Sequence, residues 1–129
     1  MLQRLYIEAT ATTPRICFDS IDGKFLIAGR SLPENTEQAY RPVIDWLTEY
    51  AKQPCEKTTI EINLDYYNST SLKKMADILM IIKEISQAHN TEASVIWLYD
   101  EEDDSSKENG EDLCYALDLP IELKIKEYE

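Results

Sequence analysis

A run of four small polar residues, Asn68-Ser69-Thr70-Ser71, is the stretch of the sequence best suited to regulated chemistry. Alternation of apolar and polar residues from Ile60 to Tyr66 predicts a strand before it. Apolar residues recurring every three or four positions from Leu72 to Ile82 predict a helix after it. The hydroxyls therefore lie where a strand ends and a helix begins.

Two interpretations of these hydroxyls follow from their position. Ser, Thr and Asn are preferred at helix N-termini because their side-chain oxygens accept hydrogen bonds from free backbone N–H groups. The same helix end favours anions, so a phosphate carried on Ser69 or Thr70 would be stabilised there. From the residues alone, capping is the simpler interpretation, because Ser and Thr are common caps.

Composition restricts the classes of function. The chain has 129 residues, which predicts one domain over residues 1–129 with a sizeable core. A net charge of −12 argues against nucleic-acid and anionic-membrane partners. The first residues lack a long apolar core, so we expect no signal peptide, and no apolar run has the length of a membrane span.

The cysteines and the histidine give no sign of a cofactor or metal site. Cys17, Cys55 and Cys114 are scattered without CxxC spacing, which is typical of a reducing cytoplasm and predicts no zinc site. His89 is the only histidine, and we expect it in a polar loop after the helix rather than in a catalytic role.

The first half of the chain predicts a hairpin followed by two helical runs. A weak strand over residues 2–10 precedes a hairpin of 15–20 and 24–30 that turns at Asp22-Gly23. Ser31 with Glu34 has the spacing of a capping box, and Pro33 suits a first helical turn. We expect that helix to end or bend at Arg41-Pro42 and a second to span Val43–Lys52, with its Trp and Tyr in the core.

The second half adds two strands and a short helix. Ser94–Tyr99 predicts a strand, Glu108–Leu117 a helix and Ile121–Ile125 a final strand. Between them, Asp100–Asp104 is acidic throughout but lacks the spacing of a calcium-binding loop, which favours a solvated loop.

This order of elements predicts an α/β fold, a mixed β-sheet with packed helices, similar in outline to the STAS domains of anti-sigma-factor antagonists. Loops that follow parallel strands gather at one edge of such a sheet. We therefore expect Arg30-Ser31, Asn68–Thr70 and Asp100–Asp104 to be neighbours.

Three stretches resemble one known family. GRSLPEN with AYRPVIDWLTEY is similar to its GRS-x-PEN and Y-x-P-x-x-x-W-L-x-x-Y pattern, and LDYYNSTSLKKMADIL is similar to its Y-[FL]-N-T-S-S-x-K pattern. VIWLYDEEDDSS and ENGEDL resemble its acidic tail motif. The family is that of the SiaC-type regulatory phosphoproteins, and the resemblance runs in order along nearly the whole chain.

The resemblance implies a bacterial switch protein that is not an enzyme and needs no cofactor. Unphosphorylated members bind a diguanylate cyclase and promote cyclic-di-GMP synthesis, which governs biofilm formation. A Ser/Thr protein kinase phosphorylates them and a metal-dependent Ser/Thr phosphatase reverses this. In register, Ser69 matches the phospho-acceptor threonine, and Thr70, which replaces a serine, is the alternate acceptor.

We expect a partner-binding surface that surrounds the acceptor and is blocked by phosphate. Its predicted members are Arg30, Ser31, Pro33, Glu34, Asn68, Ser71 and Lys73. Arg30 or Lys73 would pair with the phosphate, although Arg30 is equally suited to a salt bridge with the acidic loop.

Two other classes of function remain open from the sequence. One is an adaptor that is never modified. The other is a small metal-dependent enzyme that uses paired carboxylates such as Asp103 and Asp104; no Gly-rich loop or convergent His or Cys supports it.

Overall fold

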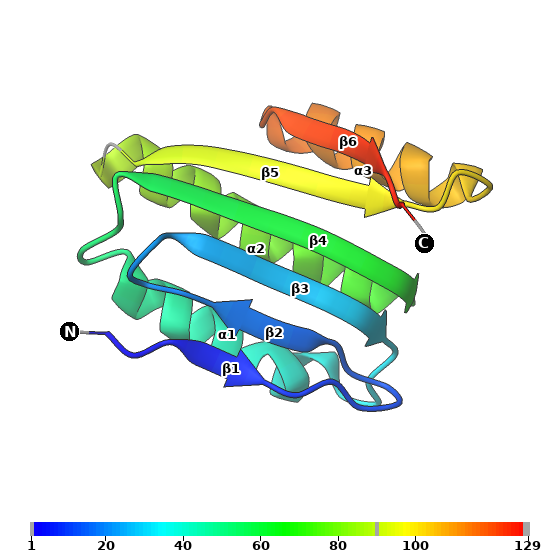
Figure 1. Cartoon of the computed structure of the whole chain (residues 1–129), viewed down its shortest axis with the longest axis horizontal. Coiled ribbons are helices and arrows are strands. Elements are labelled where there is room, and N and C mark those ends of the chain that lie inside the picture. The colour runs from blue at the N-terminus through cyan, green and yellow to red at the C-terminus, as the bar shows by residue number, and fades with distance from the viewer. Residues whose placement is uncertain (1, 90, 128–129) are drawn as a thin grey trace.

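The computed structural model describes residues 2–89 and 91–127, and within them six strands form one sheet whose spatial order follows the chain, β1-β2-β3-β4-β5-β6 (Figure 1). The elements in order are β1 (Leu5–Ile7), β2 (Arg15–Phe18), β3 (Lys24–Ser31), α1 (Thr36–Tyr50), β4 (Lys57–Tyr67), α2 (Ser69–His89), β5 (Glu92–Tyr99), α3 (Asp104–Leu117) and β6 (Ile121–Ile125). None of the described helices is both long enough and apolar enough to cross a membrane.

The predicted hairpin is confirmed in its register. Ile16 pairs with Ile27 and Phe18 with Phe25 across β2 and β3, with one face buried. The turn depends on Gly23, whose φ is +72° and where an added Cβ would lie 2.1 Å from the Lys57 carbonyl oxygen.

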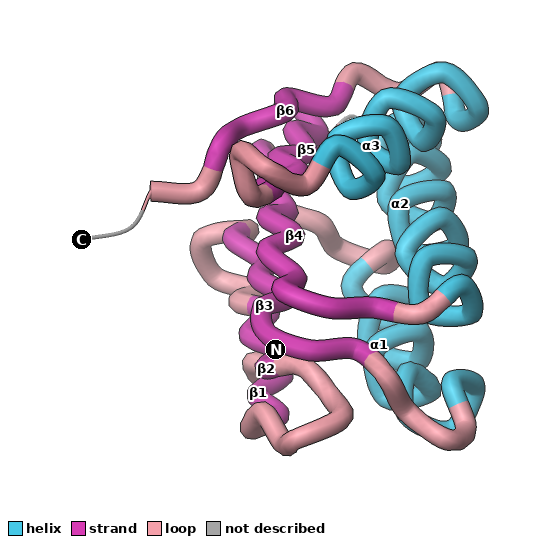
Figure 2. The backbone as a smooth tube through the Cα atoms, turned by 90° about the vertical axis from the view of Figure 1, so that its right-hand side faces the viewer, coloured by secondary structure: helices cyan, strands magenta, loops and turns pink. Residues whose placement is uncertain are grey.

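The remaining strand pairs, β3 to β4, β4 to β5 and β5 to β6, are parallel, so the predicted mixed sheet is confirmed. Each parallel step passes through one helix. Because the strand order advances in one direction, crossovers of one hand put every helix on the same face. Figure 2 shows α1, α2 and α3 together on one side of the sheet, with the other side uncovered.

The core fills the layer between helices and sheet. At its hairpin end, Phe18 and Phe25 stack with ring centroids 4.6 Å apart, and Trp46 stacks on Tyr50 at 5.2 Å. Trp46 and Tyr50 are one helical turn apart on α1 and are 8% and 1% exposed, which confirms their predicted place in the core.

The start and continuity of α1 correct two predictions. The helix begins at Thr36 with Asn35 as its N-cap, whose side chain accepts from the Gln38 N–H, so the predicted capping box of Ser31 and Glu34 is wrong. Ser31 instead belongs to β3, where it pairs with Tyr67.

The predicted break at Arg41-Pro42 is also wrong, because α1 runs through Pro42. Pro42 is exposed, so water can satisfy the Gln38 carbonyl that lost its donor. On the other face Tyr40, Val43 and Leu47 are buried, and this continuous burial outweighs the lost hydrogen bond.

The other boundaries differ from prediction at the ends. Of the strand predicted over residues 2–10, only Leu5–Ile7 forms β1. α3 begins at Asp104 rather than Glu108 because Asp103 caps it. His89 is the last residue of α2 rather than part of a loop, and Asn90 lies outside the described residues.

Candidate phosphorylation and docking site

The carboxyl ends of β3, β4 and β5 meet at one edge of the sheet, on the right of Figure 1, as predicted. One hollow of about 510 Å³ at this edge is lined by residues of all three strand ends: Arg30, Leu64, Asp65, Tyr66, Asp100, Glu102, Asp103 and Lys126. The Asn68 N–H donates to the Ser31 carbonyl at 3.2 Å, which joins the hydroxyl turn to the end of β3. The predicted neighbourhood is therefore confirmed.

The start of α2 is capped by Asn68 rather than by a hydroxyl. Asn68 Oδ1 accepts from the Ser71 N–H at 2.9 Å and from the Thr70 hydroxyl at 3.0 Å. Ser69 is exposed, and its hydroxyl has no hydrogen-bond partner among residues 2–89 and 91–127. The capping function therefore leaves Ser69 available for modification.

Ser31 and Ser71 lie inside the protein rather than on the predicted binding surface, and both are 0% exposed. The Ser31 hydroxyl donates to Ser71 Oγ at 2.7 Å, and the Ser71 hydroxyl donates to the Ser31 carbonyl at 2.7 Å. The Tyr40 hydroxyl lies 2.6 Å from Ser31 Oγ, and burial raises the pKa of Tyr40 to about 12. This hydroxyl chain ties β3, α1 and α2 together beneath the site.

A second connection joins the first turns of α1 and α2 at the surface. Thr36 Oγ1 and Thr70 Oγ1 lie 2.8 Å apart. The buried Lys74 ammonium, one turn after Thr70 on α2, forms an ion pair with Glu37, which follows Thr36 directly on α1. The hydrogen bond and charge of Lys74 hold the pKa of Glu37 below its usual value. No local sequence pattern predicts this connection, because its partners are more than 30 residues apart.

Lys73 and Arg30 lie on different sides of the site. Lys73 follows Ser69 by four residues on α2, which places the two on one helix face, and Lys73 is exposed. A β-bulge after Gly29 (φ +119°) sets Arg30 opposite Tyr66, and its guanidinium lies 5.2 Å from the Tyr66 ring centre. Lys73 is therefore the better placed cation for a phosphate on Ser69, and Arg30 faces the acidic hollow.

The connection between β3 and α1 supplies the remaining predicted residues. Glu34 is exposed and Pro33 is half-buried. Beside them Leu32 is 40% exposed, and Tyr66 is 61% exposed at the end of β4. The predicted alternation put Tyr66 on the face of the buried Ile60 and Leu64, but the β-bulge shifts the register so that Tyr66 pairs with Arg30 and is exposed. Exposed apolar side chains at this edge of the sheet are suited to docking.

The acidic run is more ordered than predicted. Asp100 Oδ1 accepts from the Glu102 N–H at 3.0 Å, and Asp103 Oδ1 accepts from the Ser106 N–H at 3.0 Å as the cap of α3. Across the described ranges, no group of three or more His, Cys, Asp or Glu side chains is arranged to hold a metal ion.

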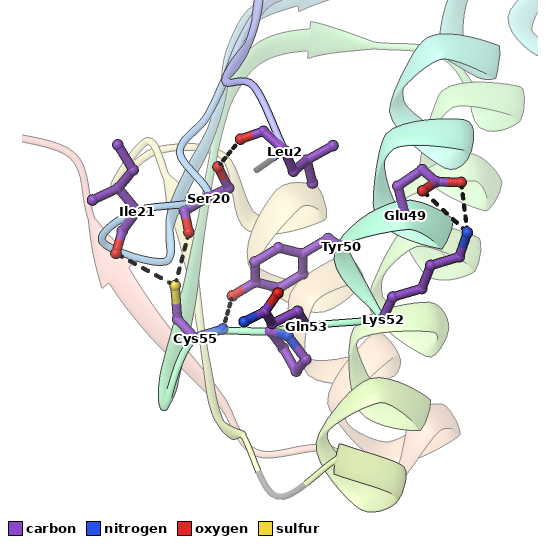
Figure 3. A pocket seen from close by; sticks show the side chains of 9 residues that line it. Leu2, Ser20, Ile21, Glu49, Tyr50, Lys52, Gln53 and Cys55 are labelled. Carbon is purple, nitrogen blue, oxygen red and sulfur yellow. Dashed lines mark hydrogen bonds and ion pairs between the residues drawn. The ribbon is translucent and has the colours of Figure 1, made fainter.

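A different hollow, of about 800 Å³, lies at the end of α1 (Figure 3). The polar groups of its lining are engaged with one another. Cys55 donates through Sγ to the Ser20 carbonyl at 3.1 Å and through its N–H to the Tyr50 hydroxyl at 3.0 Å, and the Ser20 hydroxyl donates to the Leu2 carbonyl at 2.7 Å. These contacts bind the hairpin turn to the chain after α1.

Comparisons with known proteins decide the family. The sequence model of the SiaC family regulatory phosphoproteins matches residues 7–126. The chain belongs to this family. An uncharacterised protein of Pseudomonas aeruginosa (strain UCBPP-PA14) is 29% identical over 120 residues, which are 93% of this chain and 94% of that protein.

Solved structures agree with the sequence match. Apo-SiaC from Pseudomonas aeruginosa is similar with a TM-score of 0.84 and 29% identity, over 94% of this chain and 98% of that one. SiaC in the crystal structure of the diguanylate cyclase SiaD with its activator is similar with a TM-score of 0.85 and 29% identity, over 95% and 99%. The predicted family and fold are confirmed.

Proposed function

We propose that this chain is a phosphorylation-controlled activator of a diguanylate cyclase. The observation that carries the proposal is its likeness to SiaC, described as the activator of SiaD, over nearly the full length of both chains. The chain acts by binding, without chemistry of its own, in the reducing cytoplasm that its three free cysteines favour.

The accessible hydroxyl at the start of α2 is the point of control. A phosphoserine carries a charge of about −1.5 to −2 and three acceptor oxygens. On Ser69 it meets the positive end of a 21-residue helix and the Lys73 ammonium four residues on. The phosphate is therefore stabilised where it forms.

The same phosphate blocks the docking surface. Leu32 and Tyr66 are exposed apolar side chains at this edge of the sheet. A partner that covers them must also exclude water from nearby charges, and an added dianion makes this desolvation unfavourable. The unphosphorylated form is therefore the binding form.

Ser69 is the acceptor and Thr70 is the structural hydroxyl. The Thr70 hydroxyl contacts both Asn68 Oδ1 and Thr36 Oγ1, so a phosphate there would break two contacts. A partner Ser/Thr kinase and a metal-dependent phosphatase control the modification. Intact mass and peptide mapping after incubation with a candidate partner Ser/Thr kinase should show loss of the modification in Ser69→Ala and its retention in Thr70→Val.

Binding to the purified cyclase tests the switch. We expect Ser69→Ala to bind like the wild type and Ser69→Asp to bind more weakly. Ser105 is a matched control, because it is an exposed serine in the first turn of α3. Equal affinity of Ser69→Ala and Ser69→Asp, or no modification by the kinase, would leave an unmodified adaptor as the better account.

A further inference from the structure

The uncovered face of the sheet is an unusual surface. Strands β3 to β6 are parallel, yet all three described helices lie on the other face (Figure 2). Parallel sheets in α/β proteins are almost always covered on both faces, because crossover connections place helices there. The structure leaves one face of a parallel sheet to be covered by something else.

The side chains of this face form a continuous row across the sheet. The strand registers align six outward-facing residues, one from each strand: Tyr6, Cys17, Leu26, Glu61, Ile96 and Glu122. Leu26 and Ile96 are half-buried, and Tyr6 is 58% exposed. Cys17, Leu26, Glu61 and Ile96 help line a hollow of about 380 Å³. The face is thus partly apolar and shaped to accept protruding side chains.

Charge divides this face into two halves. Strands β2 and β3 carry the outward-facing Arg15, Lys24 and Arg30, and the turn between them adds Asp19 and Asp22, which line the same hollow as Lys24. Strands β4 to β6 carry the outward-facing carboxylates Glu61, Glu92 and Glu122, together with Lys57 and Lys124. The first half therefore keeps a small excess of cations and the second has an excess of carboxylates, although the whole chain has a net charge of −12.

We propose that this face binds a second copy of the same chain around a two-fold axis that runs along the strands between β3 and β4. Such an axis places the β2–β3 half of each copy over the β4–β6 half of the other, so the basic and acidic halves meet twice. Lys24 then lies near Glu61 of the second copy, since β3 faces β4. The association requires neither Ser69 nor a cyclase.

The size of the face fits this occupant. Six strands about 4.8 Å apart span about 24 Å, and strands of eight residues such as β3 and β5 are about 26 Å long. The resulting flat area of about 600 Å² is comparable with the roughly 800 Å² that each partner buries in a standard interface. Two sheets stacked about 10 Å apart with aligned strands are an established packing.

Molar mass as a function of concentration gives the first test. Sedimentation of the full chain from about 1 µM to about 1 mM, in salt of about 0.15 M to screen the net charge, should show a rise from 14.9 kDa toward twice that mass. Cys17 is the only exposed thiol of the three, so its labelling by a thiol reagent should slow over the same range. A monomer at the highest concentration would overturn the proposal. It would also be overturned if labelling of Cys17 slowed only when the cyclase was added and not when the chain was concentrated.

A charge exchange tests the orientation. Lys24→Glu and Glu61→Lys should each lose self-association, because each variant places like charges at both Lys24–Glu61 contacts. An equimolar mixture should recover a dimer, since both contacts of the mixed pair are then between opposite charges. No recovery in the mixture would overturn the proposed axis.

A control variant separates this effect from net charge and folding. Lys107→Glu on α3 changes the net charge by the same amount at an exposed position away from the sheet face. It should associate like the wild type, and thermal melting should show all three variants folded. Loss of association in Lys107→Glu equal to that in Lys24→Glu would show a net-charge effect and overturn the assignment to this face.

Discussion

The first turns of α2 and α3 have nearly the same backbone design and opposite electrostatics. Each follows a parallel strand, and each is capped by an Asx side chain that accepts from a buried serine three residues on, Asn68 from Ser71 and Asp103 from Ser106. The first turn of α2 carries no acidic residue, whereas the start of α3 has Asp103 and Asp104. Only the start of α2 can therefore gain a phosphate without repulsion from adjacent carboxylates.

The comparison indicates that a switch needs more than a hydroxyl at a helix start. Ser69 and Ser105 are both exposed serines in first turns. Beneath α2 a chain of hydroxyls fixes the turn to β3, while the Ser106 segment is fixed by its carbonyl, which accepts from Trp97 Nε1 at 2.9 Å.

The largest effect on stability is expected at alkaline pH from Tyr40. Its pKa is raised to about 12 by burial, so its contribution is complete below the ordinary value of about 10 and is lost as the pH rises through about 12. A difference of two pKa units corresponds to about 2–3 kcal/mol. Chemical denaturation from pH 8 to 12 should show a smaller alkaline loss in Tyr40→Phe than in the wild type.

The exposed Tyr115 gives the control for this measurement, because it is 91% exposed. Tyr115→Phe should lose stability with pH like the wild type. If Tyr40→Phe loses as much unfolding free energy at alkaline pH as the wild type and Tyr115→Phe do, a role for the buried Tyr40 hydroxyl is contradicted.

The second prediction contrasts the two buried serines. Ser71→Ala removes the acceptor of Ser31 and leaves buried polar groups unpaired, which should lower the free energy of unfolding by about 1–3 kcal/mol. Ser106→Ala should change it by less than about 0.5 kcal/mol, because the Ser106 carbonyl makes the contact with Trp97. Urea titrations measure the free energy of unfolding of both variants. Equal losses in Ser71→Ala and Ser106→Ala would contradict this difference between the starts of α2 and α3.

The third prediction concerns substitutions of the N-cap residues Asn68 and Asp103. Asn68→Ala and Asp103→Ala should each lower stability by about 1 kcal/mol, since each loses one cap. Asn68→Asp should keep the cap and gain about 0.3–1 kcal/mol from the helix dipole, while adding a carboxylate beside Ser69. Kinase assays should then show slower phosphorylation of Asn68→Asp; an unchanged rate would mean that local charge does not distinguish the two starts.

The smallest effect is expected from Lys73. In the chain phosphorylated on Ser69, Lys73→Gln should remove a pair of residues four apart on the helix and lower stability by about 0.2–0.5 kcal/mol. In the unphosphorylated chain the same substitution should change nothing measurable. Thermal melts of the four samples provide the comparison, and equal shifts with and without phosphate would exclude this pair.

Local patterns predicted much of this molecule from sequence. The alternation of β4 as far as Leu64, the apolar stripe of α2 and the Asp22-Gly23 turn each depend on residues close together in the chain, and each was found. The gathering of three strand ends at one edge followed from parallel topology alone. The family resemblance added the proposal that Ser69 is the acceptor, which no periodicity could suggest.

What sequence could not predict depends on contacts between distant residues. Ser31 and Glu34 have capping-box spacing, but β3 continues through Ser31 because its hydroxyl is bound by Ser71, 40 residues away. Lys73 and Lys74 are adjacent and identical in type, yet only Lys74 is buried against α1. The acidic run was interpreted as a loop because its carboxylates repel, although one of them caps α3.

The most direct test of the account is the affinity of the cyclase for three forms of the chain: unmodified, with phosphoserine incorporated at Ser69, and with phosphoserine incorporated at Ser105. The account predicts at least tenfold weaker binding for phosphate at Ser69, about 1.4 kcal/mol, and a change of less than about twofold for phosphate at Ser105. Equal affinity of all three forms, or an equal loss from either phosphate, would contradict it.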